Sequence, residues 1–140
     1  MKNPIYTCLW FDGKAQEAAQ FYCSVFKNSQ IVSVNPMVTI FELNERKFMA
    51  LNGGPKFKFN ESVSFVIDCD TQEEIDYYWQ NLTEGGTESQ CGWLKDKFGV
   101  SWQVVPTILG SLMGNVEKAP RVVEAFMKMK KFDIQTLLNA

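Results

Sequence analysis

The chain has 140 residues, which corresponds to a single domain at the usual size of roughly 150 residues per domain. Hydrophobic residues make up 46% of the chain and aromatic residues 14%, which is enough apolar material for a packed core and excludes a disordered protein. Fourteen basic and sixteen acidic residues give a net charge of -2, so we expect one domain over residues 1–140 with no basic face for nucleic acid.

The first part of the chain predicts one helix among four strands. Residues 5–11 are rich in aromatic and β-branched side chains and predict a first strand. Alanine and aromatic residues then recur at helical spacing over residues 14–26, which predicts an amphipathic helix. Apolar runs at residues 31–34, 37–43 and 47–51 predict three more strands, of which the last two form a hairpin.

The same order of elements follows in the second part. Residues 62–69 alternate between apolar and polar side chains and predict a strand. Thr71 and Glu74 have the spacing of a capping box, so a helix should begin here. Residues 91–95 and 100–105 then predict a hairpin.

The order strand-helix-strand-strand-strand therefore occurs twice, over residues 5–52 and residues 62–105. A single module would leave one sheet face uncovered, so we expect an α+β fold in which two βαβββ modules form a cupped mixed sheet. Residues 106–140 predict a helical tail, with Pro120 in a first helical turn and Asp133 as the N-cap of a short last helix. The apolar stripes of this tail need a partner surface, on this chain or on a second copy.

Histidine is absent from the chain, which removes Ser-His and Cys-His nucleophile pairs and every histidine-ligated metal site. The cysteines are scattered without a C-x-x-C pair, which argues against a zinc ribbon and against a disulfide framework. The four are Cys8, Cys23, Cys69 and Cys91. Carboxylate, lysine or tyrosine chemistry, a lone cysteine, an oxygen-ligand metal site and binding without chemistry remain open.

No apolar run approaches the ~18 residues that a membrane helix needs, and the N-terminal residues lack the apolar centre of a signal peptide. We therefore expect no membrane partner. Free cysteines without an export signal predict a cytoplasmic protein.

Two places on the second hairpin are candidates for binding a ligand. A period of two puts Gln103 on one strand face with Ser101, and an inward glutamine would indicate a polar pocket unless it bonds a neighbouring backbone. Trp93 lies with Cys91 and Lys95 on one face of the preceding strand. An indole beside a thiol and an ammonium group can hold a flat or anionic ligand, although Trp93 as a core residue is the alternative.

Several segments resemble one known family. They are Cys-Leu-Trp-Phe-Asp-Gly at 8–13, Phe-Tyr at 21–22, Phe-Met-Ala-Leu-Asn-Gly-Gly at 48–54, Cys-Gly-Trp-Leu-Lys-Asp-Lys-Phe-Gly at 91–99, Ser-Trp-Gln-Val-Val-Pro at 101–106 and Met-Lys-Met-Lys-Lys at 127–131. Together they resemble the PhnB-like proteins of the vicinal oxygen chelate superfamily, which includes glyoxalases, bleomycin-resistance proteins and dioxygenases. Members are often labelled 3-demethylubiquinone-9 3-methyltransferase. The resemblance implies two βαβββ modules in a homodimer.

Metal-using members of the superfamily place a histidine or glutamine on the first strand of each module and a glutamate on the last. The resemblance puts Thr7, Ala50, Ser62 and Gln103 at those places. Alanine cannot ligate a metal, and hydroxyl and amide groups hold divalent ions poorly. This implies that no metal or other cofactor is bound. A shift of register by one residue would move these side chains to the other sheet face.

We therefore predict a metal-free protein that binds a small organic molecule, with no catalytic residue. The predicted ligand-binding residues are Thr7, Ser62, Cys91, Trp93 and Gln103. An enzyme of the glyoxalase or dioxygenase type, the methyltransferase of the family label, and a dimeric scaffold without a ligand are the alternatives.

Overall fold

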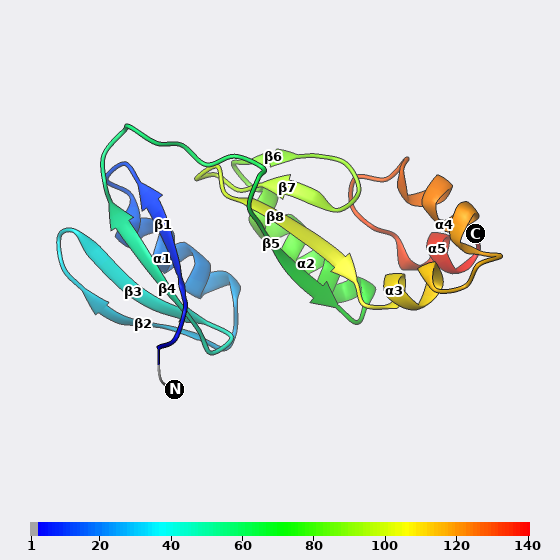
Figure 1. The fold of residues 1–140 in the computed structure, drawn as a ribbon, viewed down its shortest axis with the longest axis horizontal. Helices are drawn as coiled ribbons and strands as arrows, with labels where there is room; N and C mark the ends of the chain where they lie inside the picture. Colours follow the sequence, from blue (N-terminus) through cyan, green and yellow to red (C-terminus); the bar gives the residue numbers. More distant parts are fainter. Residues whose placement is uncertain (1–2) are drawn as a thin grey trace. The chain divides into compact units, whose positions relative to one another are not determined.

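The computed structural model describes residues 3–140, so the first two residues of the predicted domain lie outside the described part. The chain divides between Phe59 and Asn60 into two compact units, here called the N-terminal unit and the C-terminal unit. Each contains one of the predicted βαβββ modules (Figure 1). The predicted α+β fold with two such modules and C-terminal helices is confirmed.

The N-terminal unit is a four-stranded mixed sheet with one helix. Its elements are β1 (Thr7–Phe11), α1 (Ala15–Val25), β2 (Ser29–Val34), β3 (Val38–Leu43) and β4 (Arg46–Asn52). The strands have the order β1-β4-β3-β2, with β1 parallel to β4 and the other pairs antiparallel. Helix α1 buries its alanine-rich stripe against this sheet, and the ring of Tyr22 stacks on that of Phe41 with centroids 6.1 Å apart.

The C-terminal unit repeats this arrangement and adds the tail. Its elements are β5 (Ser64–Cys69), α2 (Gln72–Thr83), β6 (Thr87–Glu88), β7 (Trp93–Lys95), β8 (Ser101–Pro106), α3 (Ile108–Met113), α4 (Ala119–Phe126) and α5 (Ile134–Leu138). The strand order is β5-β8-β7-β6, with β5 parallel to β8. Helix α2 packs on one face of β5, β7 and β8. The strands of the two modules thus form two separate four-stranded sheets.

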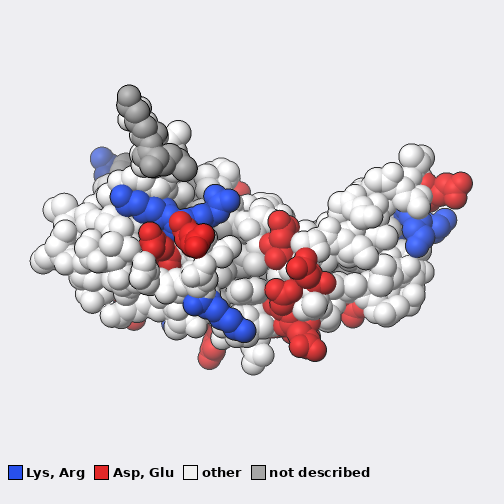
Figure 2. Space-filling view, turned by 90° about the horizontal axis from the view of Figure 1, so that it is seen from below, with Lys and Arg blue, Asp and Glu red and all other residues white. Residues whose placement is uncertain are grey.

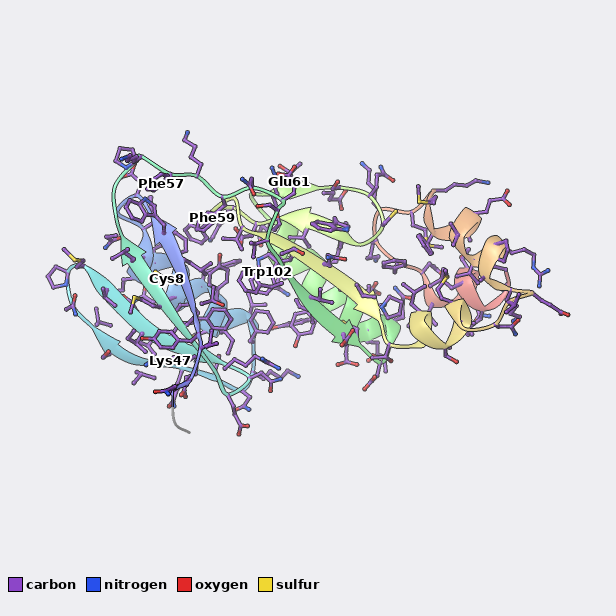
Figure 3. All side chains as sticks on the ribbon, viewed as in Figure 1. Cys8, Lys47, Phe57, Phe59, Glu61 and Trp102 are labelled. Atoms are coloured by element: carbon purple, nitrogen blue, oxygen red, sulfur yellow. The ribbon has the colours of Figure 1, made fainter. Side chains whose placement is uncertain are left out.

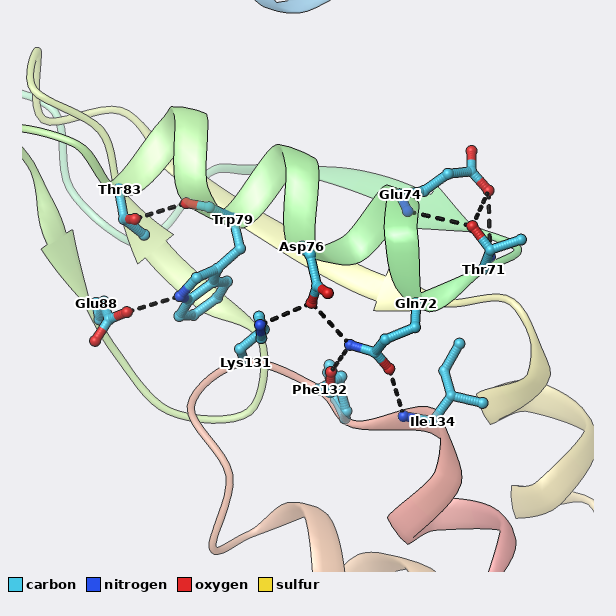
Figure 4. A network of polar contacts seen from close by, with 10 residues as sticks. All are labelled: Thr71, Gln72, Glu74, Asp76, Trp79, Thr83, Glu88, Lys131, Phe132 and Ile134. Atoms are coloured by element: carbon cyan, nitrogen blue, oxygen red, sulfur yellow. Dashed lines mark hydrogen bonds and ion pairs between the residues drawn. The ribbon is translucent and has the colours of Figure 1, made fainter.

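The predicted helix starts are confirmed at both positions. Thr71 Oγ1 accepts from the backbone N–H of Glu74, and Glu74 Oε1 accepts from the N–H of Thr71, each at 3.2 Å (Figure 4). Asp133 Oδ1 accepts from the N–H of Thr136 at 2.9 Å, which caps α5. Both caps satisfy backbone donors that the first helical turn leaves without partners.

The tail is built into the C-terminal unit. Phe132 is 2% exposed, and its ring lies against the backbone of Gly92. Gln72 of α2 donates to the carbonyl of Phe132 at 2.9 Å and accepts from the N–H of Ile134 at 2.8 Å. Lys131 Nζ lies 2.7 Å from Asp76 Oδ1, and this contact lowers the pKa of the Asp76 carboxyl group (Figure 4). The C-terminal unit itself therefore provides a partner surface for the tail.

The segment that follows β4 packs on the N-terminal unit. Phe57 meets the ring of Trp10 edge-on with centroids 5.0 Å apart, and Phe59 meets Phe11 in the same way at 5.2 Å (Figure 3).

Within residues 3–140, no helix is long and apolar enough to cross a membrane. The face drawn in Figure 2 carries groups of acidic side chains and groups of basic side chains.

One buried hydroxyl in the N-terminal unit makes a stability prediction. Thr39 is 1% exposed on the α1 side of β3, and its Oγ1 has no hydrogen-bond partner among the described residues. Replacing Thr39 with valine should raise the free energy of unfolding by about 1 kcal/mol, because it removes an unsatisfied polar group at nearly constant shape. Urea denaturation measures this change. Thr39→Ser keeps the hydroxyl and loses a methyl group, so it should destabilise by about 1 kcal/mol, and a destabilised Thr39→Val variant would contradict the prediction.

Candidate functional site

The candidate site lies on the face of the C-terminal sheet opposite α2. Leu94 of β7 pairs with Trp102 of β8, and both are buried on the α2 side. The residues that alternate with them point to the other side, because successive side chains of a strand face opposite ways. Those residues form two rows across the sheet. They are Trp93, Gln103 and Val66 in one row and Lys95, Ser101 and Ser64 in the other.

Polar groups occupy the middle of this face. Gln103 Nε2 donates to Ser64 Oγ at 3.0 Å, which links β8 to β5 through side chains. The hydroxyl of Ser101, between Ser64 and Lys95, is buried and has no hydrogen-bond partner among residues 3–140. Lys95 Nζ forms an ion pair with Glu61 at 3.0 Å, and this contact lowers the pKa of the Glu61 carboxyl group. The face therefore combines one indole with several hydrogen-bonding groups.

Two of the predicted ligand-binding residues come together here. Trp93 and Gln103 are direct partners in the β7–β8 pairing, so their side chains are neighbours on the same face. Both are half-buried. The Gln103 amide donates to the side chain of Ser64, whereas the alternative in the sequence analysis was a bond to a neighbouring backbone group.

Ser62 lies just outside the sheet. It is exposed in the turn before β5, where its N–H donates to Asn60 Oδ1 at 2.9 Å. Strand β5 begins two residues later, at Ser64, and Ser64 is the serine that contacts Gln103.

Cys91 lies before β7 and contacts the tail. Its backbone has a φ of 57°, and its N–H donates to the carbonyl of Met129 at 2.8 Å. Its Sγ lies 3.6 Å from the carbonyl oxygen of Phe126 and 3.8 Å from Met127 Sδ. The structure therefore places this thiol against the tail segment. Cys91 is not part of the β7–β8 pairing that joins Trp93 to Gln103.

Thr7 lies on β1 in the N-terminal unit. Its side chain faces α1, so β1 is shifted by one residue from the register in which Thr7 would lie on the sheet face opposite the helix. Thr7 pairs with Phe48, which pairs with Phe41, and both phenylalanines are buried on the α1 side. Ala50 is fully buried on that side too. The next residue of β1, Cys8, is exposed and points away from α1 (Figure 3).

The donors present do not fit the metal site of the metal-using superfamily members. Within residues 3–140 there is no group of three or more histidine, cysteine, aspartate or glutamate side chains that could hold a metal ion. On the face opposite α2, the possible ligands are the Gln103 amide, serine hydroxyls and the Glu61 carboxylate, which is paired with Lys95. One carboxylate with an amide and hydroxyls is a poor ligand set for a divalent ion. Gln103 and Ser64 already bond each other.

Three residues of this face were not among the predicted ligand-binding residues. They are Glu61, Ser64 and Ser101. The alternation along residues 62–69 already put Ser64 on the polar side of its strand. The period of two already grouped Ser101 with Gln103. The ion pair of Glu61 depends on the path of the chain before β5, for which the sequence carries no signal.

The motif around Asp96 supports the hairpin that carries the site. Asp96 is buried and accepts from the N–H groups of Phe98 and Val100 at 2.9 and 3.1 Å. Its other oxygen accepts from Trp102 Nε1 at 2.8 Å. Gly99, with a φ of 89°, completes the turn. This carboxylate therefore fixes the turn between β7 and β8.

The Leu-Asn-Gly-Gly segment has a structural role in the N-terminal unit. Asn52 Oδ1 accepts from the N–H of Ala15 at 2.8 Å, which satisfies a donor at the start of α1. Trp10 Nε1 donates to the carbonyl of Gly54 at 2.9 Å. A Cβ atom on Gly53 would lie 2.3 Å from the Trp10 ring, so the indole packs directly on this backbone.

The cysteines should differ in reactivity. Burial, followed by nearby carboxylates, raises the pKa of Cys69 to about 12. Partial burial raises the pKa of Cys8 too, but its side chain is exposed and open to reagent. Because the thiolate is the nucleophile, iodoacetamide at pH 8 should label native protein at Cys8 well before Cys69. Peptide mass spectrometry measures the order, and urea should make Cys69 reactive. Equal labelling of both residues in the native protein would contradict the structure.

Comparisons with known proteins agree with this architecture. The family model for 3-demethylubiquinone-9 3-methyltransferase matches residues 3–105. Among solved structures, the PhnB protein from Bacillus cereus is 34% identical with a TM-score of 0.69, over 75% of this chain and 100% of that chain. A search of curated proteins found no match.

More distant structures share the fold. Protein PA1353 from Pseudomonas aeruginosa is 21% identical with a TM-score of 0.60, over 73% of this chain and 96% of that chain. The fosfomycin resistance protein FosX from Listeria monocytogenes, in complex with Mn(II) and sulfate, is 11% identical with a TM-score of 0.58, over 86% of this chain and 97% of that one. The family model and the Bacillus cereus relative together confirm the resemblance seen in the sequence: the chain belongs to the PhnB-like 3-demethylubiquinone-9 3-methyltransferase family and has the vicinal oxygen chelate fold.

Proposed function

We propose that this protein binds a small organic molecule without a metal ion, on the face of the C-terminal sheet opposite α2. The observation that carries the proposal is the direct pairing of Trp93 with Gln103. An indole offers a flat apolar surface for stacking, and a neighbouring amide supplies orientation through hydrogen bonds. This combination of an aromatic surface with a few placed polar groups is typical of small-molecule sites.

The donor chemistry supports binding without a metal. The polar groups at the middle of this face are an amide, hydroxyls and one ammonium group that is paired with the Glu61 carboxylate, and the Gln103 amide and the Ser64 hydroxyl bond each other. The family label names a methyltransferase, but the glycine pairs at 53–54 and 85–86 belong to a loop and a helix end and do not form a phosphate- or nucleotide-binding loop. Ligand binding therefore accounts for the residues of the site better than methyl transfer does.

We propose further that the protein is a cytoplasmic homodimer. The four cysteines, all within the described part of the chain, are free. On the N-terminal unit, edge strand β2 exposes Val32 and Val34, and the following turn exposes Met37. Exposed apolar side chains on a sheet edge favour pairing with a second chain. Light scattering of purified protein tests this, and a monomer at micromolar concentration would overturn it.

Titration with a library of neutral and charged aromatic compounds tests the binding proposal. Chemical shifts of backbone amides in β7 and β8 should move, and Trp93→Ala should weaken binding at least tenfold by removing the stacking surface. Tyr77→Ala is the matched control, because Tyr77 is an exposed aromatic residue on α2, on the other side of the sheet. Addition of EDTA should change nothing. Loss of binding in EDTA, or the absence of any bound compound, would overturn the proposal.

A further inference from the structure

We infer that the ligand is an organic acid, with a flat ring on Trp93 and a carboxylate held by the hydroxyls of Ser101 and Ser64 and the ammonium group of Lys95. This inference rests on the proposed binding function and specifies the chemical class of the ligand. It is carried by the row of side chains next to the Trp93–Gln103 pair.

Ser101 is the first observation. Its side chain is 1% exposed, and its hydroxyl finds no hydrogen-bond partner among residues 3–140. Buried polar groups are rarely left without a partner, because they lose their bonds to water and gain none in return. The strand register puts this hydroxyl between Ser64 and Lys95, on the face that carries Trp93. A ligand that accepts a hydrogen bond at this place would satisfy it.

The neighbours of Ser101 are donors as well. Ser64 Oγ accepts from Gln103 Nε2, and a hydroxyl that accepts one bond still has its own hydrogen to donate. Lys95 contributes an ammonium group, which has donors and no acceptor. Donors from adjacent strands thus converge on one region of the sheet. An oxyanion is the group that such a set binds best, because charge-assisted bonds are the strong ones.

Glu61 supports the same assignment, because it already brings a carboxylate to Lys95. Its Oε1 lies 3.0 Å from Lys95 Nζ, and Lys95 lowers the pKa of the Glu61 carboxyl group. The Glu61 side chain is 64% exposed, so this contact faces water and can be exchanged. The Glu61 carboxylate therefore shows that Lys95 can hold a carboxylate, and a ligand carboxylate would compete with it for this ammonium group.

The distance between ring and acid follows from the strand geometry. Trp93 and Lys95 are two residues apart on β7, so their backbones lie about 7 Å apart along the strand. A ring joined to a carboxylate by a short flexible chain spans this separation. We use 3-phenylpropanoate as the probe and its neutral amide, 3-phenylpropanamide, as the uncharged counterpart.

Titration calorimetry with the full chain tests the inference. The acid should bind at least tenfold more tightly than the amide, and Lys95→Met should remove this difference. Glu61→Gln should strengthen binding of the acid severalfold, because it removes the competing carboxylate. Ser101→Ala should weaken binding of the acid more than binding of the amide, because a hydrogen bond to a carboxylate is stronger than one to a neutral carbonyl group. Circular dichroism of each variant verifies that it is folded.

The exposed ion pair between Glu124 of α4 and Lys128, two residues after the end of that helix, provides matched controls. Lys128→Met and Glu124→Gln change the net charge as the test variants do, at a site away from the sheet, and both should leave the affinities unchanged. Equal binding of acid and amide, with Trp93→Ala weakening both, would overturn the carboxylate assignment and leave the binding function standing. If neither probe binds while other library compounds do, the assignment fails alone. If no compound binds, both fail.

Discussion

Replacing Gly92 with alanine is expected to destabilise the C-terminal unit by about 2–5 kcal/mol. Gly92 has a φ of 81°, which costs an alanine about 1–2 kcal/mol. Its Cβ would also lie 2.5 Å from the Phe132 ring and 2.7 Å from the carbonyl oxygen of Val104. Such overpacking typically adds about 1–3 kcal/mol. Urea denaturation measures the sum, and hydrogen exchange should show loss of protection in residues 126–134.

Gly99→Ala separates the two contributions. Gly99 has a φ of 89°, similar to that of Gly92, but no described atom lies within 4 Å of the Cβ that a substitution would add. This variant should therefore pay only the backbone strain of about 1–2 kcal/mol and should keep the tail protected. If the two alanine variants lose the same stability, the close packing of Phe132 on Gly92 is not the cause.

The order of elements could be predicted because each segment has one clear period. The helical spacing over residues 14–26 and the alternation over residues 62–69 both correspond to elements of the structure, α1 and β5. The capping box at Thr71 and Glu74 is a local pattern whose partners are three residues apart, so no tertiary information was needed. The duplication, and with it the fold, followed from these local signals.

The register of β1 could not be predicted, because the strand is apolar on both faces. Leu9 and Phe11 face α1, whereas Cys8 and Trp10 alternate with them on the other side. Without a polar face, the sequence does not tell which set is inside. The alternation within each strand of the second hairpin, in contrast, is a local pattern, and it groups Trp93 with Lys95 and Ser101 with Gln103 as the structure does. The pairing of Trp93 with Gln103 itself comes from the structure.

The position of Cys91 depends on contacts between distant parts of the chain. Its N–H bonds the carbonyl of Met129, 38 residues later, and its thiol packs on the tail. No local sequence pattern predicts such a contact. The predicted strand began at Ser62, two residues before the start of β5, for a local reason: Asn60 forms a turn that delays the start of the strand. Which strand face a hairpin residue lies on could therefore be predicted, whereas contacts set by the path of the chain could not. Ligand binding by these residues stays a prediction.

Replacing Asp96 with alanine should lower the free energy of unfolding by about 3–5 kcal/mol, because it leaves buried donors without a partner. The donors are the N–H groups of Phe98 and Val100 and the indole N–H of Trp102. Asp133→Ala, which removes an exposed helix cap of the same unit, should cost only about 1 kcal/mol. Equal losses for the two variants would show that the buried carboxylate adds nothing beyond an ordinary cap.

A double-mutant cycle identifies the indole bond within this network. In Asp96→Asn, the amide oxygen can still accept from Phe98 and Val100, but the amide nitrogen then opposes the Trp102 N–H. Trp102→Phe removes that donor, so the double variant should be more stable than the sum of the single effects by about 1–2 kcal/mol. Additive losses would mean that Asp96 and Trp102 do not interact energetically. The Leu94–Trp102 pair lies along the strands between the Trp93–Gln103 pair and the Lys95–Ser101 pair. Loss of the Asp96 hydrogen bonds should therefore also loosen the strands that bring Trp93 and Gln103 together. Ligand affinity should fall with stability across these variants.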